Sequence, residues 1–126
     1  MKIKEIIAII LVLVCTAVTI SAILAYQKGH EEGRIVLLAR APEQGNFTPR
    51  EINVERGKEI NLTIRNVNVV SHGFYIPELD VMVREIKAGE AEELKITFPE
   101  PGDYLFLCTV WCSPYHMQMS GRFHVR

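Results

Sequence analysis

Two kinds of hydrophobic pattern divide the chain. Residues 6–26 form an uncharged run of mostly apolar side chains. About 21 helical residues, each rising about 1.5 Å, span close to the ~30 Å hydrocarbon core of a bilayer. In the second half of the chain the pattern changes to an alternation of apolar and polar side chains, which is typical of half-buried strands. The pattern therefore predicts one N-terminal transmembrane helix followed by a β domain.

The alternating pattern is clearest in four stretches, at residues 60–64, 94–98, 104–108 and 123–125. Turns that contain glycine or proline separate these stretches, at residues 56–58, 88–90 and 99–103. No segment of this region has a helical period. About six to eight short strands at this spacing predict an all-β fold, an antiparallel sandwich with Greek-key connections.

The charges around the apolar run indicate its orientation. Lys2 and Lys4 precede the run, whereas the charges of residues 28–34 balance one another. The positive-inside rule therefore predicts a single pass of the cytoplasmic membrane, with a cytoplasmic N-terminus and a periplasmic or extracellular domain. We expect three parts, an anchor (1–27), a tether with the first strand (28–49) and the compact domain (50–126).

A cleaved signal peptide is the alternative interpretation of the apolar run. Signal peptides share the basic start and the apolar stretch. This stretch is longer than the usual signal core, and residues 23–25 match a small-x-small cleavage site poorly. The sequence favours the anchor.

Charge excludes one class of partner. The chain has 14 Lys and Arg against 15 Asp and Glu, a net charge of -1 at pH 7. It has no basic stripe, so nucleic acid is not expected as a partner.

Four metal-ligating side chains fall within twelve residues, at Cys108, Cys112, His116 and Met119. They follow a strand that ends near Leu107 and precede one that begins near Gly121, so they belong to a single loop at one end of the sandwich. His72 lies 36 positions before Cys108, at another expected strand end. A sandwich can bring these two places together.

The softness of these donor atoms limits which metal ions the site can bind. Thiolate and thioether favour Cu(I), and imidazole accommodates either oxidation state of copper, whereas calcium and magnesium need oxygen ligands. Three alternatives remain open: a disulfide between Cys108 and Cys112, a zinc site of two Cys and two His, and a single blue-copper site. A blue-copper site leaves the second cysteine unexplained, whereas two bridging thiolates would account for both.

With the loop motif Cys-x3-Cys-x3-His-x2-Met and an upstream His, the sequence resembles the Cu-A domain of subunit II of haem-copper cytochrome c oxidases. It is also similar to the C-terminal Cu-A domain of nitrous oxide reductases. The resemblance extends over residues 71–79 and the final strand, 121–125, and covers roughly residues 50–126. It implies a cupredoxin-like Greek-key β-sandwich.

The resemblance implies six donors to two copper ions: His72, Cys108, the main-chain carbonyl of Val110, Cys112, His116 and Met119. The two thiolates would bridge the metals and each imidazole would bind one copper. The thioether and the carbonyl would each be the weaker ligand of one copper. Oxidases often have Glu at the position of Val110, but the family uses the main-chain oxygen there, so no ligand is lost.

Several neighbouring residues have expected supporting roles. Trp111, Tyr115 and Phe74 are expected to form a packed shell that excludes water, and Trp111 and Tyr115 are also a candidate electron route, with plain loop packing as the alternative. Met117 is expected to be a packing or docking residue. His124 should point away from the core as an ordinary solvated histidine. No residue is assigned a catalytic role.

The resemblance also implies a function. As subunit II, the chain would be the non-catalytic subunit through which electrons enter an oxidoreductase complex, accepting them from cytochrome c and passing them to haem in subunit I. Its partners would be subunit I, other small membrane subunits and cytochrome c. Two alternatives are a stand-alone membrane-tethered Cu-A electron carrier, resembling the nitrous oxide reductase domain, and copper delivery or storage.

Overall fold

A computed structural model of the chain describes residues 2–31 and 33–126, except for the side chains of residues 28–31. The described chain divides into a helical unit, residues 2–31, and a β unit, residues 33–126. Helix α1 (Ile3–Glu31) forms the first unit. Among the described residues, its segment Ile3–Gln27 is the one stretch long and apolar enough to cross a membrane. The helix continues beyond residue 27, so the start of the expected tether (28–49) is helical.

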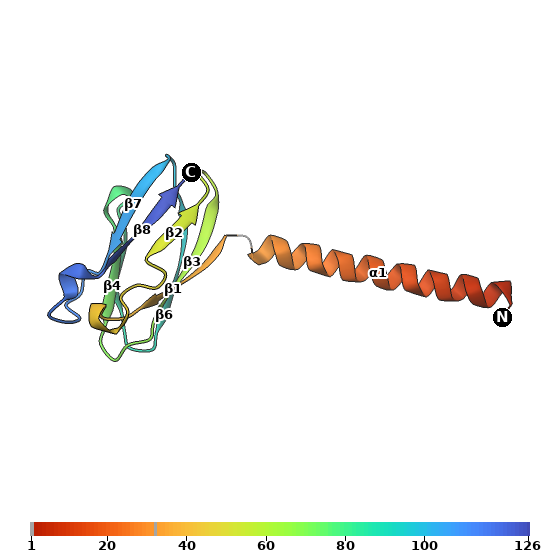
Figure 1. The fold of residues 1–126 in the computed structure, drawn as a ribbon, viewed down its shortest axis with the longest axis horizontal. Coiled ribbons are helices and arrows are strands. Elements are labelled where there is room, and N and C mark those ends of the chain that lie inside the picture. Colours follow the sequence, from red (N-terminus) through yellow and green to blue (C-terminus); the bar gives the residue numbers. More distant parts are fainter. Residues whose placement is uncertain (1, 32) are drawn as a thin grey trace. The chain divides into compact units, whose positions relative to one another are not determined.

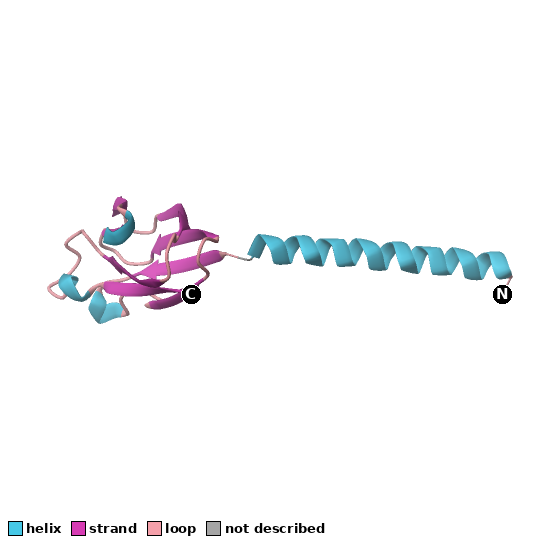
Figure 2. Cartoon of the chain, turned by 90° about the horizontal axis from the view of Figure 1, so that it is seen from above, coloured by secondary structure: helices cyan, strands magenta, loops and turns pink. Residues whose placement is uncertain are grey.

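Within the described residues 33–126, eight strands form the two sheets of a sandwich (Figures 1 and 2). The first sheet has the order β1 (Arg34–Ala39), β3 (Glu59–Asn66), β6 (Ala91–Thr97). The second has the order β2 (Glu51–Val54), β8 (Ser120–Val125), β7 (Gly102–Leu107), β4 (His72–Ile76), β5 (Val81–Ile86). Three short 3-10 turns interrupt the loops, at η1 (Pro42–Gln44), η2 (Pro77–Leu79) and η3 (His116–Gln118). The predicted fold class, a β-sandwich with one N-terminal apolar helix, is confirmed.

The prediction of a purely antiparallel sandwich is wrong at two edges. β1 pairs with β3 in parallel, and β2 pairs with β8 in parallel, whereas the other pairings are antiparallel. The cause is the crossing of the chain from the first sheet to the second between β1 and β2. Neither strand lies beside a hairpin neighbour, so its direction is not fixed by a tight turn.

The core follows the alternation in the sequence. Ile60, Leu62 and Ile64 on β3 are buried, as their spacing predicted. Between the sheets, the rings of Phe47 and Phe106 lie edge to face with centroids 5.3 Å apart, and other phenylalanines extend this aromatic cluster. Such ring pairs add about 0.5–1.5 kcal/mol each to the stabilisation from burial.

Strand directions bring the two predicted ligand segments to one end of the sandwich. β7 ends at Leu107, β8 begins at Ser120, and β4 begins at His72, close to the predicted boundaries. Because β7 is antiparallel to both β4 and β8, the end of β7 lies beside the starts of the other two. The loop between β7 and β8, drawn in blue in Figure 1, therefore projects from the end of the sheet where His72 lies.

Candidate metal centre

The fold brings His72 to the two cysteines of the loop. One ligand atom from each of His72, Cys108 and Cys112 lies within 4.8 Å of the others, and all three residues are buried. Nδ1 of His72 is 3.9 Å from Sγ of Cys108. The carbonyl oxygen of Val110 lies 3.3 Å from the same sulfur. The first sulfur thus has one imidazole and one main-chain oxygen beside it.

The second sulfur has a matching pair of neighbours. Nδ1 of His116 is 3.7 Å from Sγ of Cys112, and Sδ of Met119 is 3.6 Å from it. Met119 is buried, while His116 is partly exposed. The structure therefore gathers the other four predicted donors around the two sulfur atoms.

Backbone hydrogen bonds explain why the loop closes in this way. The N–H of Met119 donates to the carbonyl of His116 (2.9 Å), which ends the turn η3. The N–H of Cys108 donates to the carbonyl of Met119 (3.0 Å), so the last donor residue is tied to the first. The N–H of Gly73 donates to Sγ of Cys108 (3.4 Å), which links the start of β4 to the cluster.

The electrostatics of the cluster suit a bound cation. Burial, together with the neighbouring Cys108, raises the pKa of the Cys112 thiol to about 12. Two adjacent thiolates are therefore unfavourable unless a metal neutralises them. Burial, and to a lesser extent His116, lowers the pKa of His72, which favours the neutral imidazole that binds metals.

The donor chemistry fits copper. Cys108 and Cys112 are free thiols in the structure, so no disulfide joins them. Nε2 of His72 is buried and has no hydrogen-bond partner among the described residues. Two sulfurs, two imidazoles and a buried thioether form a soft set that copper prefers, and a thioether is not among the usual zinc ligands.

The loop exposes its aromatic residues, contrary to one expectation. Trp111 is 72% exposed and Tyr115 is 54% exposed, so the prediction that they form a packed shell is wrong for both. Phe74 is buried, as expected. The Trp111 ring lies beside the His116 ring, with centroids 6.2 Å apart, and Met117 is 88% exposed. The loop presents exposed apolar side chains around a cluster whose donor side chains are buried except for that of His116.

Sequence reasoning missed three residues that contact this loop from the segment between β1 and β2. They are Glu43, Asn46 and Arg50, which bond to Ser113, Gln118 and Ser120 respectively. About 70 residues separate the members of each pair. No local pattern signals such contacts.

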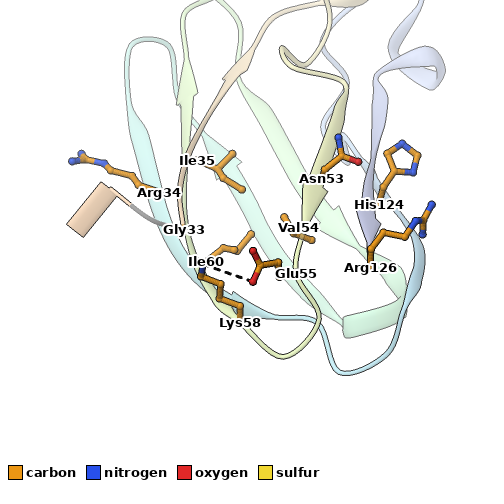
Figure 3. A pocket seen from close by; sticks show the side chains of 10 residues that line it. All are labelled: Gly33, Arg34, Ile35, Asn53, Val54, Glu55, Lys58, Ile60, His124 and Arg126. Carbon is orange, nitrogen blue, oxygen red and sulfur yellow. Dashed lines mark ion pairs between the residues drawn. The ribbon is translucent and has the colours of Figure 1, made fainter. Parts of the chain in front are cut away.

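A cavity of about 400 Å³ lies at the other end of β8. It opens between the first strands of the two sheets and has Ile35, Val54 and Ile60 among its lining residues. His124 on β8 and Arg126, which follows the end of this strand, line another side (Figure 3). None of the six predicted donors lines it, so it is separate from the donor cluster.

Comparison with protein families and curated proteins gives concordant matches. The family described as "Cupredoxin-like domain" matches residues 7–125. Cytochrome c oxidase subunit 2 of Thermus thermophilus is 31% identical over 100 residues, which cover 79% of this chain and 70% of the relative. The same subunit from a second strain of this organism is 31% identical, but the match spans only 56% of its length. Nitrous-oxide reductase of Stutzerimonas stutzeri is 30% identical over 95 residues, which cover 73% of this chain and 14% of the enzyme.

Solved structures match the fold. A chain of a heme-copper terminal oxidase dimer superposes with a TM-score of 0.64 at 22% identity, over 98% of this chain and 99% of that chain. Auracyanin from Roseiflexus castenholzii superposes with a TM-score of 0.61 at 20% identity, over 75% of this chain and 97% of that chain. At these identities the likeness is one of fold.

Proposed function

Since the chain belongs to the cupredoxin-like domain family and is homologous to cytochrome c oxidase subunit 2, we propose that it carries electrons through a dinuclear Cu-A centre. One observation carries this proposal. Each of two buried sulfurs has one imidazole and one weaker donor beside it. A site for one metal ion would not need both sets.

The six donors would hold two copper ions, with the thiolates of Cys108 and Cys112 as bridges and one imidazole on each metal. When bound, such a pair supplies one-electron transfer with small changes in its bonds. The chain contributes rigidity and burial. His72 and Met119 are almost fully buried, and the backbone bonds around η3 fix the loop. Water is thereby excluded from most of the cluster, which keeps its environment constant during electron transfer.

Within a membrane, the chain would serve as subunit II of a haem-copper oxidase. It would accept electrons from cytochrome c and pass them to haem in subunit I, without binding the oxidase substrate itself. The apolar N-terminal helix and the similarity to subunit 2 of Thermus thermophilus support this role. Trp111, exposed and beside His116, is the candidate route for the incoming electron.

Copper loading of the full chain in detergent tests the dinuclear centre. We expect two copper ions per chain and, after one-electron oxidation, an electron spin shared equally by two copper nuclei. Cys112→Ser removes one bridge and should abolish the shared spin. A single copper per chain, or a spin confined to one nucleus, would contradict the proposal.

Isolation from native membranes tests the oxidase role. We expect the chain to co-purify with a haem-bearing integral membrane subunit. If it is recovered with copper but without such a subunit, a stand-alone membrane-tethered carrier becomes the better proposal. The similarity to nitrous-oxide reductase supports that second candidate. The match covers about a seventh of the enzyme, so the chain corresponds to one part of that protein rather than to the whole of it.

A further inference from the structure

The segment that joins β1 to β2 lies beside the ligand loop. Figures 1 and 2 show η1 next to η3, although the two turns are far apart in the sequence. Three side chains of residues 41–50 form hydrogen bonds with Ser113, Gln118 and Ser120. Each of these partners is next in sequence to a residue of the candidate metal site, either Cys112 or Met119.

Asn46 is the most buried of the three side chains. Its Nδ2 donates to the carbonyl of Gln118 (2.8 Å), and its Oδ1 accepts from the N–H of Phe47 (2.7 Å). Asn46 is buried and has a positive φ of 63°, a conformation that Asn tolerates better than most residues. Phe47 is fully buried in the aromatic cluster. The side chain of Asn46 therefore ties the loop to the core.

Glu43 and Arg50 add contacts on either side. The hydroxyl of Ser113 donates to the carboxylate of Glu43 (2.9 Å) and accepts from the N–H of Tyr115 (3.1 Å). Nε of Arg50 donates to the carbonyl of Ser120 (3.1 Å). Ser113 directly follows Cys112 and Ser120 directly follows Met119, so these contacts hold the middle and the end of the loop.

We propose that residues 41–50 act as a brace that positions the metal donors, with Asn46 as its central positioning residue. This inference rests on the metal site proposed above. The brace fixes the carbonyl before Met119 through Asn46 and the carbonyl after Met119 through Arg50. The main-chain N–H and carbonyl of Met119 itself are bonded within the loop. The thioether is thereby held at its distance from Cys112.

Asn46→Asp is the sharpest test, because the two side chains have the same shape. The substituted side chain keeps an acceptor for the N–H of Phe47 but replaces the donor to Gln118 with a carboxylate oxygen. Asn53→Asp is the matched control, since Asn53 is exposed on β2, the strand that follows the brace. We expect both variants to bind two copper ions. The loss of one hydrogen bond changes an equilibrium constant by about fivefold. Asn46→Asp should therefore release copper to a Cu(I) chelator about fivefold faster, and its reduction potential should shift.

A second pair of variants covers the case in which Asn46→Asp fails to fold. Glu43→Gln retains an oxygen that accepts from Ser113, whereas Glu43→Ala does not. We expect Glu43→Gln to release copper at the wild-type rate and Glu43→Ala to release it faster. Restoration by the amide would show that the hydrogen bond, rather than the charge, positions the loop.

The brace proposal is overturned if Asn46→Asp and Glu43→Ala lower only the stability of the metal-free chain and leave copper release and the reduction potential unchanged. Failure of the dinuclear centre is a separate result, detected in the wild type by copper counting. If the wild type binds one metal ion, release of that ion decides the question in the same way. If it binds none, amide hydrogen exchange of residues 113–119 decides it, with faster exchange expected in Asn46→Asp.

Discussion

Gly73 lies between the donor residue His72 and the aromatic core, where no space remains for a side chain. A Cβ at this position would clash with the side chain of Thr109 and would lie 3.2 Å from the carbonyl oxygen of Arg84. We expect Gly73→Ala to lower the free energy of unfolding by about 1–3 kcal/mol, the usual effect of overpacking. Urea unfolding of the metal-free chain measures this change.

The clash partner supplies the control for Gly73→Ala. Thr109→Ala removes the hydroxyl that the new methyl group would meet, so the double variant should regain part of the lost stability. The N–H of Gly73 also donates to Sγ of Cys108, and a shift of β4 should therefore weaken copper binding in the single variant. Unchanged stability of Gly73→Ala would show that the two segments are not packed this closely.

The donor residues could be predicted individually, whereas their supports could not. Cysteine, histidine and methionine at short regular spacing are typical of a soft-metal site, and the structure gathers them at one end of the sandwich. The exposure of Trp111 and Tyr115 was not predictable, because a loop has no period from which to infer burial. Asn46 was missed because a polar residue is buried only when a distant partner satisfies it, and that partner is 72 positions away.

At the scale of elements, His124 joins three strands of the second sheet. Its Nε2 lies 2.6 Å from a carboxylate oxygen of Glu51 on β2, and its Nδ1 lies 2.8 Å from one of Asp103 on β7. The side chain points away from the core, as the alternation in β8 predicted. The prediction that it is an ordinary solvated histidine is wrong, because its side chain is only 25% exposed and lies between two acids.

This arrangement predicts a pH dependence of stability. The hydrogen bond with Asp103, and then that with Glu51, raises the pKa of His124. The protonated imidazole is thus stabilised in the folded state, and this contribution is complete below the unfolded pKa of about 6.5. It is lost as the pH rises through the raised folded pKa. Asp103, whose pKa is lowered chiefly by the same bond, titrates at lower pH.

Unfolding of the wild type and of His124→Gln at several pH values isolates this effect, because titrations elsewhere are common to both chains. We expect the destabilisation by His124→Gln to be largest near pH 5.5 and to decline toward pH 9. The variant Lys95→Gln, which breaks an exposed ion pair with Glu59, serves as a control and should show little pH dependence over this range. A difference for His124→Gln that does not change with pH would contradict the prediction.

The strands could be predicted from their alternation, but the pairing of the edge strands could not. A strand's own pattern reports which face is buried, whereas its neighbour depends on where the chain crosses between the sheets. The prediction therefore failed in the direction of β1 and β2, and it named no strand at the position of β2. The end of α1 was also unpredictable, because the polar residues after position 27 fit either a helix or a tether.

At the scale of the whole molecule, the apolar surface of the ligand loop is the expected contact for an electron donor. Trp111 and Met117 are both highly exposed, and the Trp111 ring lies beside His116. We expect Trp111→Ala to slow electron uptake from a cytochrome c by about tenfold or more, as loss of a central aromatic contact often does. The reduction potential should remain near that of the wild type, since the ring binds no metal.

Stopped-flow kinetics and redox titration measure the two quantities separately, and Tyr26→Ala, a change within α1, is the control. An unchanged rate would exclude Trp111 from the electron route.

The apolar helix is the candidate membrane anchor of the chain. If Ile3–Gln27 spans the membrane, the purified protein keeps its full mass of 14.3 kDa and stays in the membrane fraction after an alkaline carbonate wash. With Lys2 and Lys4 inside, protease added to intact spheroplasts should digest the β domain, and protease added to inverted vesicles should not. Placing three lysines after the helix and removing Lys2 and Lys4 should weaken this orientation.

Recovery of a shorter, wash-soluble chain would identify a cleaved signal peptide. In that case the domain would have no membrane anchor of its own and would reach its acceptor from solution.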